Sequence, residues 1–302
     1  MANKKMKLFL VKRFRGSELG SVFRVLSRNP LSLIGGTIVL VFYLIAIIVA
    51  AAGDRVLPYN PNEVNSANIL ASPSLAHPMG TDSLGRDMLS RVIASIPIDA
   101  SLSLVVIAAS LLIGIILGSI AGYFGGIIDE VIMRLTDIIL AFPGIVLTLA
   151  IASALGASLI NMAIALILVW WSPYVRIARG VTLSVKENQY IEAARASGLG
   201  SLTIIRRHII PNILSPMLVY ASLDIGYIIL TASVLSYLGV GVQPPQAEWG
   251  RMVFEMQSYL FSQWWLPIFP GLAITITVLG FNLLGDALRD ILDPRTRKIV
   301  GG

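Results

Sequence analysis

The sequence predicts an all-α integral membrane protein with six transmembrane helices. Hydrophobic residues make up 56% of its 302 residues and charged residues only 13%, and the mean hydropathy is +0.80. Soluble domains carry about 25% charged residues, so this chain lacks the groups needed to cover a surface in water. Its apolar residues also form runs of about 20, the length that a helix needs to cross a bilayer.

Six segments qualify as transmembrane helices by length and composition. The first is also compatible with a signal peptide, because Ala50 and Ala52 form an A-x-A cleavage pattern. Its apolar run is longer than the roughly 7–15 residues of a signal peptide's apolar region, so we expect a retained helix. The predicted spans are 31–52, 100–122, 136–155, 159–178, 213–238 and 266–285.

Six spans place both termini on the same side of the membrane. With this topology 4 of the 23 Lys and Arg residues (Arg55, Arg86, Arg91 and Arg251) lie on the opposite side, which leaves 19 on the side of the termini. Loops rich in Lys and Arg stay in the cytoplasm, so we expect both termini there. The basic tail then serves orientation and contact with anionic lipids rather than nucleic-acid binding. Its basic residues include Lys4, Lys5, Lys7, Lys12, Arg13 and Arg15.

The predicted organisation has five parts, and the fourth contains a long cytoplasmic loop, 179–212. The parts are a cytoplasmic basic tail (1–30), an N-terminal transmembrane helix (31–52), an external loop with an interfacial helix (53–98), a five-helix core (99–286) and a cytoplasmic C-terminal tail (287–302).

The cytoplasmic loop has the pattern of a docking surface for another protein. A first helix is expected to start near Glu187, to present small residues such as Ala193, and to end in a turn at Gly198 and Gly200. A second helix, about 201–209, is expected to stop at Pro211. On the residues alone, an amphipathic loop lying on the lipid headgroups explains the same pattern.

One motif in this loop resembles a known signature. Glu192-Ala193-Ala194, then Gly198 and Ile210-Pro211, resemble the EAA-x3-G-x9-I-x-L-P signature of permease subunits in binding-protein-dependent ABC importers. His208 stands at the first Ile of the signature, as is frequent in the peptide-importer branch. The resemblance implies a coupling helix that fits a cleft in an ATPase subunit. The residues that it assigns to ATPase coupling are Glu192, Ala193, Ala194, Gly198, Arg206 and Pro211.

Three further segments extend the resemblance along most of the chain. In order, they resemble the HPLGTDxLGRD, LGLGxQPPxxxWG and GDxLRDxLDPR stretches of one subunit family. That family is the second permease (DppC/OppC type) of dipeptide and oligopeptide ABC importers. The segments are 77–87, 238–250 and 285–295.

The resemblance implies a type I ABC importer transmembrane domain with one extra N-terminal helix. It implies a transport subunit rather than an enzyme, with ATP and magnesium bound by separate ATPase chains. The expected partners are a second permease (DppB/OppB type), two ABC ATPase subunits, an extracytoplasmic substrate-binding protein and the lipid bilayer. Nucleic acid is not expected as a partner.

No cofactor or metal is expected on this chain itself. It has no cysteine, its two histidines (His77 and His208) are far apart in the sequence, and it has no G-x-x-x-x-G-K-[ST] phosphate-binding loop. Di- or oligopeptides are the expected substrates, with oligosaccharide or nickel as alternatives. An ion-coupled secondary transporter and a membrane scaffold or enzyme are the competing function classes.

The external segments hold candidates for receptor contact. For Arg86 and Asp87 the alternative is a set of local ion pairs beside an interfacial helix capped by Thr81 or Asp82. For Trp249 the alternative is an aromatic belt at the membrane–water interface. The helix would carry an apolar stripe of Leu84, Met88, Val92 and Ile96. The receptor-facing candidates are Arg86, Asp87, Gln243 and Trp249.

Asp224 lies midway along the predicted span 213–238. A carboxylate costs roughly 2.5–3.5 kcal/mol to insert there, so it should face protein or a water-filled path. In the family pattern a Glu lies two turns later, where this chain has Ala232 on nearly the same face. We expect Asp224 to line the translocation path and to meet a substrate ammonium. The alternatives are protonation or an ion pair with Arg134 or Arg176.

Overall fold

The computed structural model describes residues 29–292. Within this range the regular structure is helical, apart from an isolated bridge between Thr81 and Asp87, so the all-α prediction is confirmed. Five helices are long and apolar enough to cross a bilayer, and one bent pair makes a sixth candidate crossing. The helices are α2 (Pro30–Ala52), α3 (Met88–Phe124), α4 (Gly126–Leu140), α5 (Gly144–Leu155), α6 (Leu159–Lys186), α7 (Gln189–Ala196), α8 (Ser201–Ile204), α9 (Ile210–Tyr237), α10 (Trp249–Met256) and α11 (Trp265–Leu292).

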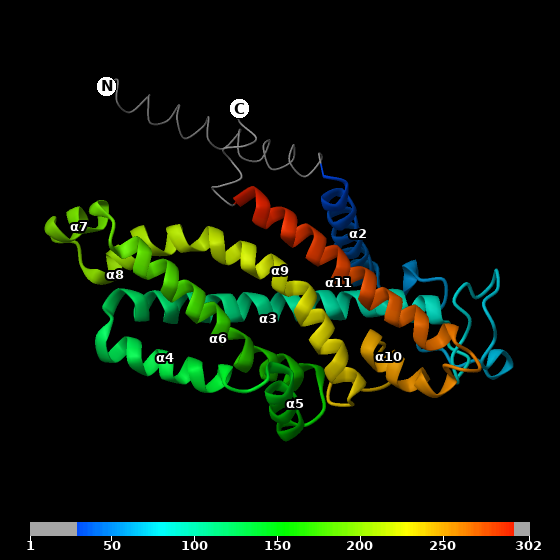
Figure 1. Ribbon diagram of the computed structural model, residues 1–302. Helices are drawn as coiled ribbons and strands as arrows, with labels where there is room; N and C mark the ends of the chain where they lie inside the picture. The colour runs from blue at the N-terminus through cyan, green and yellow to red at the C-terminus, as the bar shows by residue number, and fades with distance from the viewer. Residues whose placement is uncertain (1–28, 293–302) are drawn as a thin grey trace.

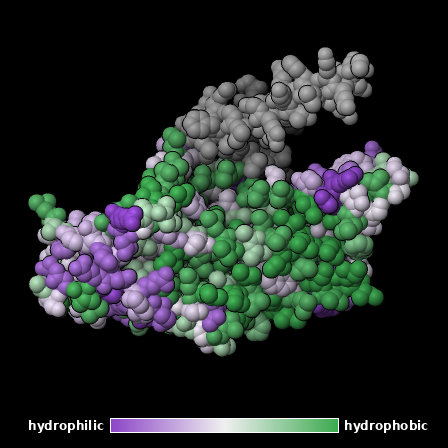
Figure 2. Space-filling view, turned by 180° about the vertical axis from the view of Figure 1, so that it is seen from behind, coloured by the Kyte–Doolittle hydropathy of each residue, from purple (hydrophilic) through white to green (hydrophobic). Residues whose placement is uncertain are grey.

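The long helices lie side by side between two polar ends. α3 runs along the molecule with α6 beside it, while α2 packs on α11 and α11 packs on α9 (Figure 1). α7 and α8 lie at one end, and α10 with the loop before α3 lies at the other. Figure 2 shows a broad hydrophobic surface between hydrophilic residues gathered towards the two ends. This distribution is what a bilayer requires of a protein that crosses it.

Small residues let α3 and α6 approach closely. The stripe Gly114, Gly118 and Gly122 faces α6, and a Cβ built on Gly118 would lie 2.6 Å from the Cβ of Ala178. In a membrane, where lipid is as apolar as the side chains, such close packing is a main source of helix association. The stripe is therefore used for packing within this chain.

The predicted third span, 136–155, is wrong as a single helix. α4 and α5 meet at 89°, and Pro143 stands at the junction with extended backbone. Proline lacks the N–H that a continuing helix needs. Ion pairs instead hold α4 along α6, with 2.5 Å between Arg179 Nε and Asp129 Oδ1 and 2.6 Å between Arg176 Nη2 and Asp137 Oδ1.

The external helix also begins later than predicted. Asp87, rather than Thr81 or Asp82, caps α3, and its Oδ2 accepts a hydrogen bond from Ser90 N at 2.8 Å. From Met88 the helix continues without a break to Phe124, so the interfacial segment and the second span are one helix. At the other end of the chain, α11 continues to Leu292, beyond the predicted boundary at 286. The basic residues of the N-terminal tail and the segment 293–302 lie outside the described residues.

Candidate coupling surface and translocation site

α7 stands at one end of the molecule (Figure 1), and it buries one face and exposes the other. Ile191 and Ala194 are buried against the core, whereas Glu192 and Ala193 are exposed. The guanidinium of Arg195 lies 5.1 Å from the centre of the Tyr123 ring at the end of α3, a favourable cation–π geometry. The predicted coupling helix is thus a firmly held element that presents Glu192 to solvent.

Gly198 ends α7 in the way that its position in the motif requires. Its φ of +77° lies in the left-handed region, which glycine adopts without steric cost. The next residue closes the turn, because Leu199 N donates to Ala194 O at 3.2 Å. This is the helix-ending pattern in which a left-handed residue satisfies the last carbonyls, and it sets the direction of the chain towards α8.

The segment after α8 corrects the prediction that a helix stops at Pro211. Residues Ile205–Ile209 form a turn of π-helix that leads directly into α9, and Ser201–Tyr237 is one continuous helical path. Pro211 lies in the first turn of α9, directly after the π turn, so the helix continues through it with one backbone hydrogen bond fewer. Arg206, Arg207 and Pro211 are exposed.

Leu202 is a surface residue that the sequence alone did not single out. It is 78% exposed and lies in the polar loop beside α7. Tyr190, at the start of α7, is 44% exposed. We name the exposed residues Tyr190, Glu192, Ala193, Gly198 and Leu202 the coupling surface, after the role that the motif predicts for α7.

Asp224 has a neutral partner in this structure. The hydroxyl of Tyr174 donates to Asp224 Oδ2 at 3.1 Å, and the carboxylate is partly accessible. The two arginines considered as partners are engaged elsewhere, Arg134 with Glu130 at 3.5 Å and Arg176 with Asp137 at 2.6 Å. Asp224 therefore forms no ion pair with Arg134 or Arg176 in this structure.

Family comparisons agree with these features. Residues 114–298 match the binding-protein-dependent transport system inner membrane component family. Residues 17–73 match the N-terminal transmembrane domain of oligopeptide transport permease C. The chain belongs to this permease family. It is thus a multi-pass inner membrane component of a binding-protein-dependent ABC transporter.

Similar permeases cover nearly the whole chain. The probable D,D-dipeptide transport permease DdpC of Escherichia coli (strain K12) is 42% identical over 94% of this chain and 93% of its own length. The dipeptide permease DppC of Alkalihalophilus pseudofirmus is 40% identical over 91% and 89%. The glutathione permease GsiD of Pectobacterium atrosepticum is 41% identical over 85% of each chain.

Three of the four external candidates of the permease are buried. Arg86 is 5% exposed and Asp87 3%; Arg86 Nε lies 2.6 Å from Asp82 Oδ2, and Asp87 Oδ1 lies 2.8 Å from His77 Nδ1. Trp249 is 1% exposed and donates to Val92 O at 3.0 Å. In this structure these residues hold the external segments together, and none of the three lies on the outer surface.

Gln243 is the external candidate that is exposed. Its amide donates to Gly239 O at 3.1 Å and Gly241 O at 3.0 Å, so it also shapes its own turn. Nearby, Glu248 caps α10 by accepting from Gly250 N and Arg251 N at 2.9 and 2.8 Å. Burial raises the pKa of the Glu248 carboxyl, and these two donors oppose that effect.

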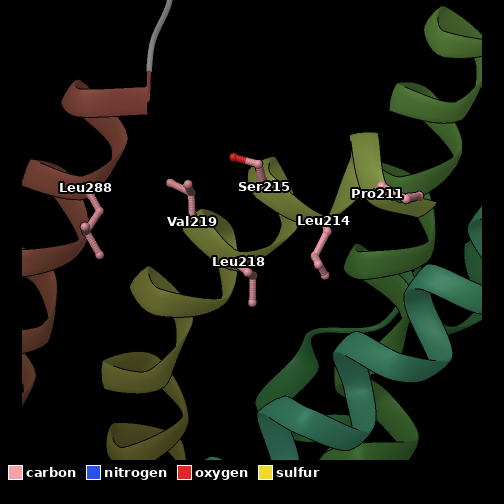
Figure 3. Close-up of a pocket in the computed structure, with 6 residues that line it drawn as sticks. All are labelled: Pro211, Leu214, Ser215, Leu218, Val219 and Leu288. Atoms are coloured by element: carbon pink, nitrogen blue, oxygen red, sulfur yellow. The ribbon is translucent and has the colours of Figure 1, made fainter. Parts of the chain in front are cut away.

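A groove of about 390 Å³ lies between α9 and the C-terminal part of α11. Figure 3 shows its side chains, five from α9 and Leu288 from α11. Ser215 provides the only side-chain hydroxyl in this lining, so the groove offers almost nothing to orient a polar substrate. Its residues are Pro211, Leu214, Ser215, Leu218, Val219 and Leu288.

Proposed function

We propose that this permease forms half of the translocation path of an ATP-driven importer for di- or oligopeptides. Its relatives are named as permeases for D,D-dipeptides, dipeptides and glutathione, all short peptides or close analogues of them. Binding-protein-dependent transport requires a substrate receptor. A second permease and two ATPase subunits complete the proposed assembly, with ATP and magnesium bound by the ATPases.

The helical connection between the coupling surface and Asp224 supports the proposal. The coupling surface leads through α8 and the π turn into α9, and that continuous helix carries Asp224. About 35 Å of helix separates Ser201 from Asp224 at 1.5 Å per residue. A displacement of the loop by an ATPase would therefore move the helix on which the proposed path residue lies.

The proposed mechanism is alternating access driven from the coupling surface. Closure of the ATPases on ATP shifts α7, which Ile191 and Arg195 fix to the rest of the permease. Glu192 is the acidic contact on the ATPase side, and Leu202 is the apolar one. The ends of the chain and the coupling surface lie in the cytoplasm in this proposal, supported by the 19 Lys and Arg residues on that side of the predicted topology and the 4 on the other.

A mild-detergent pull-down of the tagged chain from its native membrane tests the proposal. We expect ATPase subunits and a second permease to be recovered with ATPase activity. The ATPase subunits and the ATPase activity should be lost when segment 192–198 is replaced by a Gly-Ser linker, while the permease stays in the membrane. Recovery of the chain alone, without ATPase activity, under conditions that preserve known importers would contradict the proposal.

A further inference from the structure

Aromatic side chains surround Asp224 on the seam between α6 and α9. Tyr220, Asp224 and Tyr227 follow each other at i, i+4 and i+7 on α9, so they share one face. Trp170 and Tyr174 are one turn apart on α6. We name these five residues the Asp224 cluster.

The buried members of the cluster hold its accessible members in place. Tyr174 donates to the carboxylate at 3.1 Å, and its ring meets the ring of Tyr220 edge-on, with centres 5.2 Å apart. Trp170 packs on Tyr227 at 5.6 Å, and its indole also faces the carboxylate. Both α6 aromatics are buried, whereas Tyr227 is 48% exposed and Asp224 and Tyr220 are partly accessible.

This arrangement is suited to an organic cation. The carboxylate accepts a hydrogen bond from a neutral phenol, and no described Lys, Arg or His lies within salt-bridge distance of it. Aromatic faces add attraction for an ammonium within about 6 Å of the ring centre. A hard metal ion is a poorer fit, because it needs about six or more oxygen ligands and the cluster offers one carboxylate and tyrosine hydroxyls.

We propose that the Asp224 cluster binds the ammonium group of the transported molecule, the free N-terminus of a peptide, as it passes the middle of the permease. This inference rests on the proposed function, since it places the cluster on the translocation path. Asp224 supplies the charge, and the rings of Tyr220 and Tyr227 flank the bound nitrogen. Trp170 and Tyr174 are positioning residues, because they hold the carboxylate and the two exposed rings.

The test uses the whole assembled complex, purified without receptor or ATP, with a fluorotyrosine placed at Tyr227 and read by 19F NMR. Two probes are compared, Ala-Ala amide and N-acetyl-Ala-Ala amide, which differ in the ammonium group. We expect the free amine to shift the signal saturably at millimolar concentrations and the acetylated probe to leave it unchanged. Tyr237 lies at the end of the same helix, and its hydroxyl donates a hydrogen bond to Gln257 at 2.7 Å. A fluorotyrosine at this position should show no change of its 19F signal.

Variants of the carboxylate complete the test. Asp224→Asn should abolish the shift or weaken apparent affinity by at least about tenfold, and Asp224→Glu should keep it. Equal shifts with both probes, an unchanged shift in Asp224→Asn, or no shift with the free amine would each overturn the inference. Because the assay needs no ATPase coupling, its failure beside a successful pull-down would leave the importer function standing.

Discussion

Arg86 has a structural place in the external loop. Its guanidinium is 2.6 Å from Asp82 and 3.4 Å from Glu255, and the residue is 5% exposed. A buried charge without its partner is costly because neither water nor a counter-ion replaces the lost contact. The sequence allowed either receptor contact or local ion pairing, and the structure contains the local ion pairs.

Replacement of Arg86 should destabilise the permease. We expect Arg86→Ala to lower stability by about 1–3 kcal/mol, because Asp82 loses its nearest buried partner and keeps only the more distant guanidinium of Arg91, at 3.7 Å. Arg134→Ala is the matched control, since Arg134 and Glu130 are 77% and 65% exposed and such pairs contribute about 1 kcal/mol or less. Thermal unfolding of the complex in nanodiscs measures both. Equal stability of the two variants would show that Arg86 is not a structural residue.

Asp224→Asn should slow transport without preventing assembly. The variant keeps the shape of the side chain but removes its charge, so we expect peptide uptake at saturation to fall about tenfold, the equivalent of one charge-assisted hydrogen bond. The apparent KM should stay near its original value if the receptor sets it. Uptake by reconstituted complex is the measurement, with Asp224→Glu as the control. Unchanged uptake and stability in Asp224→Asn would contradict the proposal that Asp224 lies on the translocation path.

Some of these residues were predictable and others were not. Asp224 stood out because hydropathy makes a mid-span carboxylate rare, but its aromatic neighbours come from α6, which no local pattern links to α9. Tryptophan is typical of a membrane–water interface, yet Trp249 is buried and donates a hydrogen bond to Val92 O, which only tertiary packing decides. Leu202 carried a weak signal, an apolar residue in a polar loop.

Helix packing is set mainly by small residues between α3 and α6. Gly118 is one of the residues at which α6 comes closest, and the Val175 carbonyl would lie 2.6 Å from an added Cβ. Gly180, which lies on α6 whereas Gly118 lies on α3, has no atom within 4 Å of an added Cβ. Substitution of these two glycines by alanine therefore distinguishes the effect of close helix packing on stability from the effect of helix propensity.

Gly118→Ala should destabilise the permease, and Gly180→Ala should not. The added methyl at Gly118 forces two helices apart, at a cost of about 1–3 kcal/mol. At Gly180 it meets open space, and alanine is the better helix former by roughly 1 kcal/mol. Comparison of the melting temperatures of the two variants in the same nanodiscs checks this. A lower melting temperature for Gly180→Ala than for Gly118→Ala would refute the packing described.

At the level of elements, most of the helical spans were predictable from hydropathy alone. The first, second, fourth, fifth and sixth spans fall within α2, α3, α6, α9 and α11 with differences at their ends. The third span was not predictable from hydropathy, because its sequence is apolar enough for one helix, whereas Pro143 divides it into two. Asp87 was overlooked as a cap because Thr81 and Asp82, a few residues earlier, have equally suitable side chains.

The orientation of the whole molecule is open to direct measurement. The chain has no cysteine, so one introduced cysteine reports one position. Ser72 in the loop before α3 and Ala196 at the end of α7 are both exposed. We expect a membrane-impermeant maleimide to label Ser72→Cys in intact cells and Ala196→Cys only after the membrane is opened. The reverse labelling pattern would invert the proposed topology.

Coupling between ATP hydrolysis and peptide uptake can be measured with the complex reconstituted in proteoliposomes. Uptake of peptide and hydrolysis of ATP are measured together for the original chain, for Glu192→Lys and for Glu187→Lys, the last being an exposed carboxylate of the same loop outside the coupling surface. We predict that Glu192→Lys lowers both rates by about tenfold or more and that Glu187→Lys changes neither. Full ATP-driven uptake by an assembled Glu192→Lys complex would contradict the proposed role of α7.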